Sequence, residues 1–583
     1  MAGPLATLKS RFASLTERRE DAHSRAIMQA LEPKAFLGFS HYPTAHEFGD
    51  FNAARGALKG EITIHGQKFA LTDLTPWTLS LPAQNLTGHL HRFGWLGEFA
   101  ALSSKAARAR ATGWLLGWLD RYEDGTGPAP IWAPDVVAER LLSMVTHTAF
   151  LADALSDDAE QRVINALSAH LAYGLKTLDE ANGNITRIMA TLDLLQSALC
   201  FKGFEGDAVA LQQRLEQDCG QHLSHDGAIP SRNPERLLTL FQKLIWTGVA
   251  LDETNHARGP AHSKSIKLIA PVLRALRHGD GSLARFHGGS GGRHGALDRA
   301  LAESRIRTRE YGEASMGFVQ LRSSRLVAIM DCARPPSGPD AMTAHASTLG
   351  FELSSGRRPI VVSVGPGATF GPDWARSPRT TTSHSALALD KTSSSQLAQR
   401  PTGPDPHNIE LVSRPSMVTV SKAGDHSGSW LQARQDGYIE DYGLLHERRL
   451  FVGAMGREAH GEDVLFSPES KAERRFAQRI KGSEKLGVGL SVHFHLHPDV
   501  DATFLRETDT IRLLLKNGET WNFRQNGGQI DLETSAYLDP ELPEPVATKQ
   551  IVLRARATTH KAEVSWSFVR HHADGPAVRD TAT

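Results

Sequence analysis

The spacing of apolar residues changes once along this chain, near Met316, and this change constrains the fold more than any other feature. From about Leu86 to Leu276 the apolar residues recur every three or four positions, as on one face of a helix. After Met316 they alternate with polar residues, as in half-buried strands, and turns rich in Gly, Asn, Asp and Pro separate the runs. Helices first and strands second favour separate packed domains over a mixed α/β sheet.

The helical part contains several segments of ordinary globular length. Helices are expected over residues 99–122, 134–155, 157–178, 185–201, 207–223 and 234–249. Because short connectors join them, we expect helical hairpins packed in layers. Before them, a polar helix and a short hairpin in GEITIHGQKFALTD make a mixed segment. The predicted division is 1–75 (mixed), 76–290 (helical) and 291–583 (strands).

Two segments have the composition of loops. Gly279–Gly295 contains seven glycines in seventeen residues, which predicts a loop or linker next to the domain boundary. Lys391–Pro406 is rich in Ser, Thr and Pro and is expected to form a long exposed loop.

Composition excludes some classes of function. The 583 residues carry 65 basic and 65 acidic side chains, so the formal net charge is zero and binding to nucleic acid through bulk charge is not expected. Three cysteines without a CxxC pair indicate neither a disulfide framework nor a zinc ribbon. The charged N-terminus lacks an apolar signal core, and no stretch is apolar enough to span a bilayer. A cytoplasmic location is expected, or a periplasmic one if the N-terminus is incomplete; the oligomeric state stays open.

Several motifs occur in the order typical of one family. The stretch AHASTLGFELSSGRRPIVVSVG, from Ala344, is followed by a His-Ser pair at His384, and both resemble the start of the β-sandwich domain in the heparinase II/III family of polysaccharide lyases. The segments HRFGWLGEFAAL, PIWAPDVVAERLLSMVTH, HDGAIPSRNPERLLTL and DGYIEDYGLLHERRL resemble further family segments. The resemblance implies an α+β multidomain protein, in which an incomplete (α/α) toroid precedes an antiparallel β-sandwich.

The resemblance also implies an activity, which is β-elimination on a polysaccharide or oligosaccharide that contains uronic acid. That reaction needs a group that neutralises the uronate carboxylate, a base for the C5 proton and an acid for the leaving oxygen. Asn184 matches the family's carboxylate-binding Asn, although an N-cap of the following helix is an equal alternative. His345, Tyr438 and Tyr442 are the candidate acid–base groups. For the two tyrosines, packing with a satisfied hydroxyl is the alternative.

Further residues are candidates for substrate binding. Guanidinium groups suit carboxylates, so arginines from several helices would make a basic cleft, with ordinary surface arginine as the alternative. The arginine candidates are Arg140, Arg187, Arg232 and Arg236, and His384 and Trp95 complete the predicted binding set. Trp95 is equally typical of a helical core.

Three positions depart from the family pattern. Ile185 stands where active relatives have His, Arg236 where they have the catalytic Tyr, and Ser363 about where some have a metal-binding Asp. With the carboxylate missing, His345 and His384 lack a third strong ligand, so no cofactor is expected and a structural zinc is not favoured. The sequence favours a carbon–oxygen lyase acting on an acidic polysaccharide. The alternative is an inactive carbohydrate-binding or polysaccharide-assembly protein that keeps the lyase fold.

Overall fold

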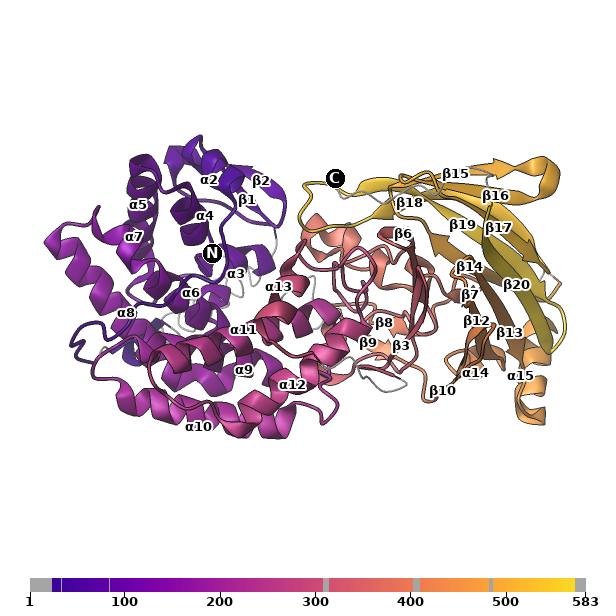
Figure 1. Cartoon of the computed structure of the whole chain (residues 1–583), viewed down its shortest axis with the longest axis horizontal. Helices are drawn as coiled ribbons and strands as arrows, with labels where there is room; N and C mark the ends of the chain where they lie inside the picture. Colours follow the sequence, from indigo (N-terminus) through magenta and orange to yellow (C-terminus); the bar gives the residue numbers. More distant parts are fainter. Residues whose placement is uncertain are drawn as a thin grey trace, which may run out of the picture. The chain divides into compact units, whose positions relative to one another are not determined.

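The computed structural model describes residues 24–571 apart from Pro33, Ala83, 308–313, 402–408 and 482–485 (Figure 1). Packing divides the chain into two compact units. We call Met1–His222 with Gln242–Lys264 the helical unit, and Leu223–Phe241 with Ser265–Thr583 the β unit. These two units need not coincide with the predicted domains, so the boundaries predicted at residues 75 and 290 stay a prediction.

The helical unit contains most of the predicted helices. Its elements are α2 (Phe51–Leu58), β1 (Glu61–Ile64), β2 (Gln67–Ala70), α3 (Gln84–His91), α4 (Trp95–Leu102), α5 (Lys105–Tyr122), α6 (Pro134–Thr146), α7 (Thr148–Ala152), α8 (Asp157–Thr177), α9 (Asn184–Leu199) and α10 (Glu205–His222). Parts of α11 (Pro234–Glu253) and α12 (Pro260–Ala275) follow. The predicted hairpin is β1–β2, and residues 24–30 of the predicted polar helix are helical, while residues 1–23 lie outside the described part.

Two predicted helices are each divided in the structure. Residues 134–155 form α6 and α7, which are separated at His147. Residues 99–122 were expected to be continuous, but α4 ends where Ser103 takes a left-handed conformation (φ 48°). Ser104 then caps α5, and its side chain accepts a hydrogen bond from the backbone of Ala107. Two adjacent serines at such a break are typical of caps, because a short hydroxyl replaces the missing intrahelical partners.

The β unit contains three α-helices, the remaining parts of α11 and α12, and eighteen strands among its described residues. The first helix and the strands are α13 (Ala296–Glu303), β3 (Phe318–Ser323), β4 (Leu326–Asp331), β5 (Phe351–Ser355), β6 (Arg358–Val361), β7 (Leu387–Leu389), β8 (Gln396–Leu397), β9 (Leu411–Ser413), β10 (Val418–Gly424), β11 (Gly428–Gln435), β12 (Leu445–Gly453), β13 (Glu458–Phe466), β14 (Val488–His495), β15 (Val500–Leu505), β16 (Thr510–Leu515), β17 (Thr520–Asn526), β18 (Gln529–Tyr537), β19 (Val546–Ala557) and β20 (Lys561–Arg570). Two short helices, α14 (Ile439–Tyr442) and α15 (Ser470–Lys481), interrupt them.

These strands form antiparallel sheets that share one core. An eight-stranded sheet has the order β10-β11-β12-β13-β20-β17-β16-β15, and two four-stranded sheets have the orders β18-β19-β14-β7 and β3-β4-β5-β6. Inward residues of all three sheets, among them Leu321, Phe351, Phe494 and Trp566, pack in a single cluster. The predicted fold class is therefore confirmed: a helical N-terminal part and a sandwich of antiparallel sheets. No helix in the described part of the chain has both the length and the apolarity of a membrane span.

The two predicted loops are less exposed than their composition suggests. Between α12 and α13 the Gly-rich segment forms no helix or strand, as expected, but Leu283, Phe286 and His287 within it are buried in the β unit. In the second loop Ser394 and Ser395 are buried, while residues 402–408 lie outside the described part. The many glycines of Gly279–Gly295 therefore reflect tight backbone turns and not exposure of the segment to solvent.

Gly461 on β13 is expected to tolerate no side chain. A Cβ there would lie 2.0 Å from Cζ2 of the buried Trp566 ring, which passes directly beneath it. Gly461→Ala should therefore destabilise the β unit by about 1–3 kcal/mol through overpacking. The measurement is urea unfolding, and the control is Gly206→Ala in α10, where an added Cβ meets nothing within 4 Å. Equal stability of the two variants would contradict the prediction.

Candidate functional site

Two of the predicted site residues meet in the interior of the β unit. Nδ1 of His345 lies 3.1 Å from Nε2 of His384, and Nδ1 of His384 lies 3.1 Å from Oγ of Ser363. His345 precedes β5, Ser363 follows β6 and His384 precedes β7, so strands of two different sheets bring them together. All three are buried, and His384 has no exposed surface.

Burial decides the protonation state of both histidines. It lowers the pKa of His384 to about 3, and the nearby His287 and His495 act in the same direction. Burial likewise holds the pKa of His345 well below its usual value. Both rings are therefore neutral near pH 7. A neutral imidazole is a competent base, but only within hydrogen-bond reach of the proton it removes, and these rings are enclosed by protein.

The hydrogen-bonded groups around His345 and His384 connect to two further side chains, His287 and Asp331, which the sequence did not single out. The backbone N–H of His345 donates to Nδ1 of His287 over 3.2 Å, and Nε2 of His287 lies 3.3 Å from Oδ2 of Asp331. Asp331 also accepts a hydrogen bond from Ser347 and pairs with Arg232. Burial alone would raise the pKa of Asp331, but Arg232 and His287 hold it well below its usual range. No motif marked His287 or Asp331, because their partners come from distant segments.

Arg232, predicted to bind substrate, is a structural residue of the β unit. Its guanidinium donates to the backbone oxygens of Met316 (3.0 Å) and Gly317 (3.1 Å), in addition to the ion pair with Asp331. It also lies 4.6 Å from the ring centre of Phe318. A guanidinium with its donors used in this way has no face left for a substrate carboxylate.

Arg236 is half-buried in the first turn of α11, close enough to Asp340 for its charge to act on that carboxyl group. The S-R-N-P motif has a local structural role here. Asn233 accepts hydrogen bonds from the backbone of Glu235 and Arg236, and Pro234 is the first residue of α11. Asn before Pro is a typical start of a helix.

The two predicted catalytic tyrosines are buried and bonded to the backbone. The hydroxyl of Tyr438 donates to the carbonyl of Leu387 over 2.6 Å, and that of Tyr442 donates to the carbonyl of Leu389 over 3.2 Å. They attach β7 to the segment around α14. Burial raises the pKa of Tyr438 far above its usual value, so its hydroxyl is neither a base nor a ready acid.

Tyr438→Phe is therefore expected to act on stability and not on ligand binding. Removal of the hydroxyl leaves the Leu387 carbonyl without this donor and should cost about 1–2 kcal/mol of unfolding free energy. Urea unfolding measures the loss. Affinity for any glycan that the wild type binds should not change, and a selective loss of affinity at unchanged stability would restore the catalytic interpretation.

In the helical unit, Arg140 and Trp95 belong to an aromatic core. Arg140 has no exposed surface; it donates to the backbone oxygens of His91 (3.1 Å) and Ile131 (2.9 Å), and its guanidinium lies 4.5 Å from the Trp118 ring centre. Trp95 is 4% exposed and packs among other aromatic rings. Trp95 therefore has the core position that the sequence left open as the alternative. Arg140 is neither a substrate ligand nor a surface arginine, because it is buried in this core.

Arg187 and Asn184 lie at the start of α9. Arg187 forms an ion pair with the buried Asp218 at 3.1 Å and contacts His222. The N-cap of α9 is Gly183 (φ 89°), so the N-cap alternative for Asn184 is wrong; Asn184 is the first helical residue. Its side chain is exposed and makes no hydrogen bond to the described residues. Of the predicted catalytic residues, only Asn184 is available to a ligand.

A structural metal does not fit the groups that meet at His345. Among the described residues, no three His, Cys, Asp or Glu side chains come together as a metal site. The third neighbour of the two histidines is the Ser363 hydroxyl, which is a weaker zinc ligand than a carboxylate. The expectation that the protein holds no zinc stays a prediction.

Comparisons with known proteins agree with the fold. The family model described as heparinase II/III-like, C-terminal, matches residues 313–567. The crystal structure of heparinase III superposes with a TM-score of 0.69, covering 94% of this chain and 89% of that one at 12% identity. The heparan sulfate lyase HepC from Pedobacter heparinus superposes with a TM-score of 0.52, covering 95% and 89% at 12% identity.

A protein related in sequence is named for its location and not for a lyase activity. FtsZ-localized protein C of Caulobacter vibrioides is 27% identical over 528 residues, which cover 88% of this chain and 87% of that protein. The resemblance seen in the motifs is thus confirmed at the level of the domain and the fold. The chain has the toroid-plus-sandwich fold of heparinase III, and its residues 313–567 match the model of the heparinase II/III-like C-terminal domain.

Proposed function

We propose that this chain is a polysaccharide-binding protein that keeps the lyase fold without the lyase chemistry. One observation carries the proposal: every acid–base group that the resemblance suggested is buried and bonded to protein. His345 and His384 hydrogen-bond each other, and Tyr438 and Tyr442 bond to backbone carbonyls. β-Elimination needs a base and an acid that touch the sugar, and these groups do not meet that condition.

The substitutions at family positions support the same proposal. Ile185 is buried in α9 and offers no polar atom, and Arg236 has a guanidinium, which donates hydrogen bonds but has no acceptor atom, so neither replaces the His and Tyr of active relatives. Loss of chemistry with retention of fold is common, because function depends on a few site residues and the fold depends on the whole core.

The Caulobacter relative supports a role other than polymer breakdown. It is named for localisation with FtsZ, and not for an activity on a polysaccharide. We propose that this chain shares that localisation. A fluorescent fusion of the full chain should then follow FtsZ in dividing cells, and a distribution that is independent of FtsZ would contradict this part.

Binding without turnover is the direct test. The full chain is incubated with polygalacturonate, hyaluronan and the neutral polymer dextran, and both retention on the immobilised polymer and the absorbance of unsaturated uronate are measured. We expect retention on at least one uronate polymer and no absorbance change. Retention on none would overturn the proposal, and steady formation of unsaturated product would overturn its non-catalytic part.

A second candidate, the lyase, is favoured by Asn184 alone, because this amide is exposed at the position of the family's carboxylate-binding Asn. If turnover is seen, Asn184→Ala should lower kcat more than it raises KM, by about a hundredfold or more. The matched control is Asn182→Ala, which removes an exposed amide two residues away. Equal activity of the two variants would remove Asn184 from the mechanism.

A further inference from the structure

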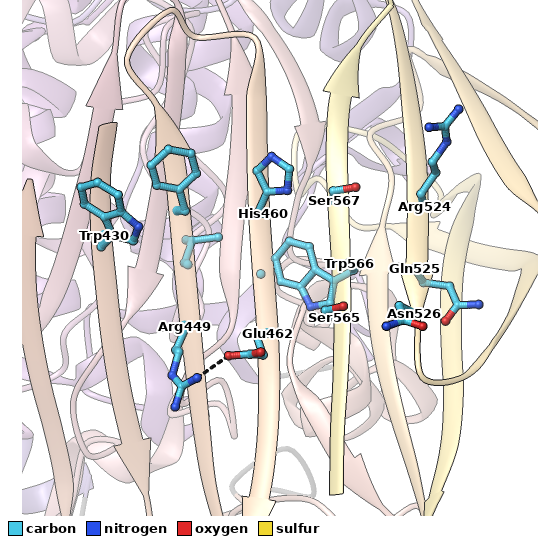
Figure 2. Close-up of a pocket in the computed structure, with 13 residues that line it drawn as sticks. Trp430, Arg449, His460, Glu462, Arg524, Gln525, Asn526, Ser565, Trp566 and Ser567 are labelled. Carbon is cyan, nitrogen blue, oxygen red and sulfur yellow. Dashed lines mark hydrogen bonds and ion pairs between the residues drawn. The ribbon is translucent and has the colours of Figure 1, made fainter. Parts of the chain in front are cut away.

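The outer face of the eight-stranded sheet carries a hollow of about 430 Å³ (Figure 2). Its lining comes from β11, β12, β13, β20 and β17, which are neighbours in the sheet. The volume lies within the range of small-molecule sites, which is roughly 300–1,000 Å³. None of the residues predicted from the sequence lines it, so the hollow is separate from the buried histidines.

Strand register orders the lining into two rows across the sheet. The aromatic row consists of Trp430, Phe451, His460, Ser567 and Arg524, which are cross-strand partners in that order. The polar row consists of Arg449, Glu462, Ser565 and Asn526, paired in the same way. With strands about 4.8 Å apart, five strands make a row of roughly 19 Å. The rows therefore offer a surface long enough for an extended oligomer.

The depth of the hollow comes from β20. Its outward residues here are Ser565 and Ser567, and longer side chains stand on both sides, from β13 and from β17. Beneath, the indole N–H of Trp566 donates to the buried Asp463 over 2.9 Å, and Asp463 also pairs with the buried Arg448. The outward side chains of β20 are small, and the side chains beneath them are held by hydrogen bonds and an ion pair. The hollow is therefore present before any ligand binds.

One end of the aromatic row presents rings to solvent. Trp430 is 38% exposed, and its ring centre lies 4.9 Å from that of Phe451. The Phe451 ring lies 6.0 Å from His460. An exposed, contiguous aromatic surface on a soluble sheet is typical of a binding surface, since large apolar side chains otherwise favour burial.

The other end presents a cation. Arg524 is exposed, and its side chain makes no hydrogen bond or ion pair to the described residues. Arg449 differs, because it pairs with Glu462 at 2.5 Å (Figure 2) and with Glu447 at 2.7 Å. A guanidinium without a partner at one end of an aromatic row can take a carboxylate bidentately.

We propose that this hollow binds an acidic oligosaccharide. The apolar faces of sugar rings stack on Trp430 and Phe451, hydroxyl groups bond to Glu462 and Asn526, and a uronate carboxylate pairs with Arg524. A nucleic acid fits less well, because its phosphates follow one another along the whole chain and some would face Glu458 and Glu462 on β13, whereas a single uronate carboxylate pairs with Arg524 on β17. An extended peptide would find no free backbone groups on the face of a sheet. The inference rests on the proposed function and assigns its site.

The test compares two variants with two matched controls. Trp430→Ala and Arg524→Ala remove the stacking surface and the cation. Leu514→Ala and Arg512→Ala remove an exposed Leu and an exposed Arg from β16, outside the hollow but on the same face of the sheet. The probes are oligogalacturonate and a neutral maltooligosaccharide, and titration calorimetry gives the affinities.

For oligogalacturonate, Trp430→Ala should weaken binding at least about tenfold. Arg524→Ala should weaken binding of the acidic probe and abolish the preference over the neutral one, and both controls should bind as the wild type does. Wild-type affinity in Trp430→Ala and Arg524→Ala would overturn this site while leaving the proposed function in place. If the wild type itself binds no uronate probe, the proposed function fails as well.

Discussion

Asp331→Ala is expected to destabilise the β unit by about 3–5 kcal/mol. The substitution leaves the guanidinium of Arg232 buried without its counter-charge and removes the acceptor of the Ser347 hydroxyl. The cost is large because the medium around a fully buried pair does not solvate an uncompensated charge. The measurement is the urea midpoint of the β-unit transition.

A surface pair provides the matched control for Asp331. Asp298 pairs with Arg277 at 2.9 Å, and their side chains are 55% and 31% exposed. Asp298→Ala should cost no more than about 1 kcal/mol, since water screens the pair. The same contrast tests the sequence-based role of Arg232: if Asp331→Ala is as stable as Asp298→Ala, the ion pair is not structural and Arg232 is again free to bind a ligand.

Acidification from pH 7 to pH 5 is expected to lower the stability of the β unit. The pKa of His384 is lowered by burial from 6.5 to about 3 in the folded protein, so the unfolded chain takes up a proton near pH 6.5 and the folded chain does not. This stability is fully present above pH 6.5 and is lost as the pH falls towards 3. Linkage gives a loss of about 2 kcal/mol for one such histidine at pH 5.

A second histidine adds to the effect. Burial also lowers the pKa of His495 to about 3, so these two histidines together account for a loss of about twice that amount between pH 7 and pH 5. The slope of the unfolding free energy against pH gives the number of protons taken up on unfolding. His384→Asn should lower that number by about one, whatever the substitution does to stability at pH 7. His426→Asn is the control, because His426 is exposed. A slope that is unchanged in His384→Asn would contradict the buried neutral state.

The sequence was informative about elements and poor about side-chain environments. Apolar spacing predicted the helices and most of the strands, because period 3.6 and period 2 are local properties. It missed the strands β8, β9, β13, β15 and β18 and the helices α12, α13 and α15. In β13, β18 and α15 charged residues obscure the pattern. It also joined α4 to α5 and α6 to α7, since each break depends on the conformation of one or two residues.

The predicted site is where tertiary structure changed the interpretation most. Each of Arg140, Arg232, Tyr438 and Tyr442 matched a pattern of site chemistry, but each is buried among partners from distant segments. Sequence spacing gives the type of a side chain and not its burial. The hollow around Trp430 and Arg524 left no local signal either, because its rows combine the consecutive strands β11, β12 and β13 with β17 and β20 from later in the chain.

By itself, the sequence determined the order of the two parts, the antiparallel sandwich and the likeness to heparinase, because these follow from local periodicity and from motifs within continuous segments. The tertiary structure alone decided which polar groups are inside the β unit, which ring nitrogens stay neutral, and where an aromatic row and a free cation meet on the surface. Those properties depend on contacts between residues as far apart in the chain as Arg232 and Asp331, and on the water that burial removes.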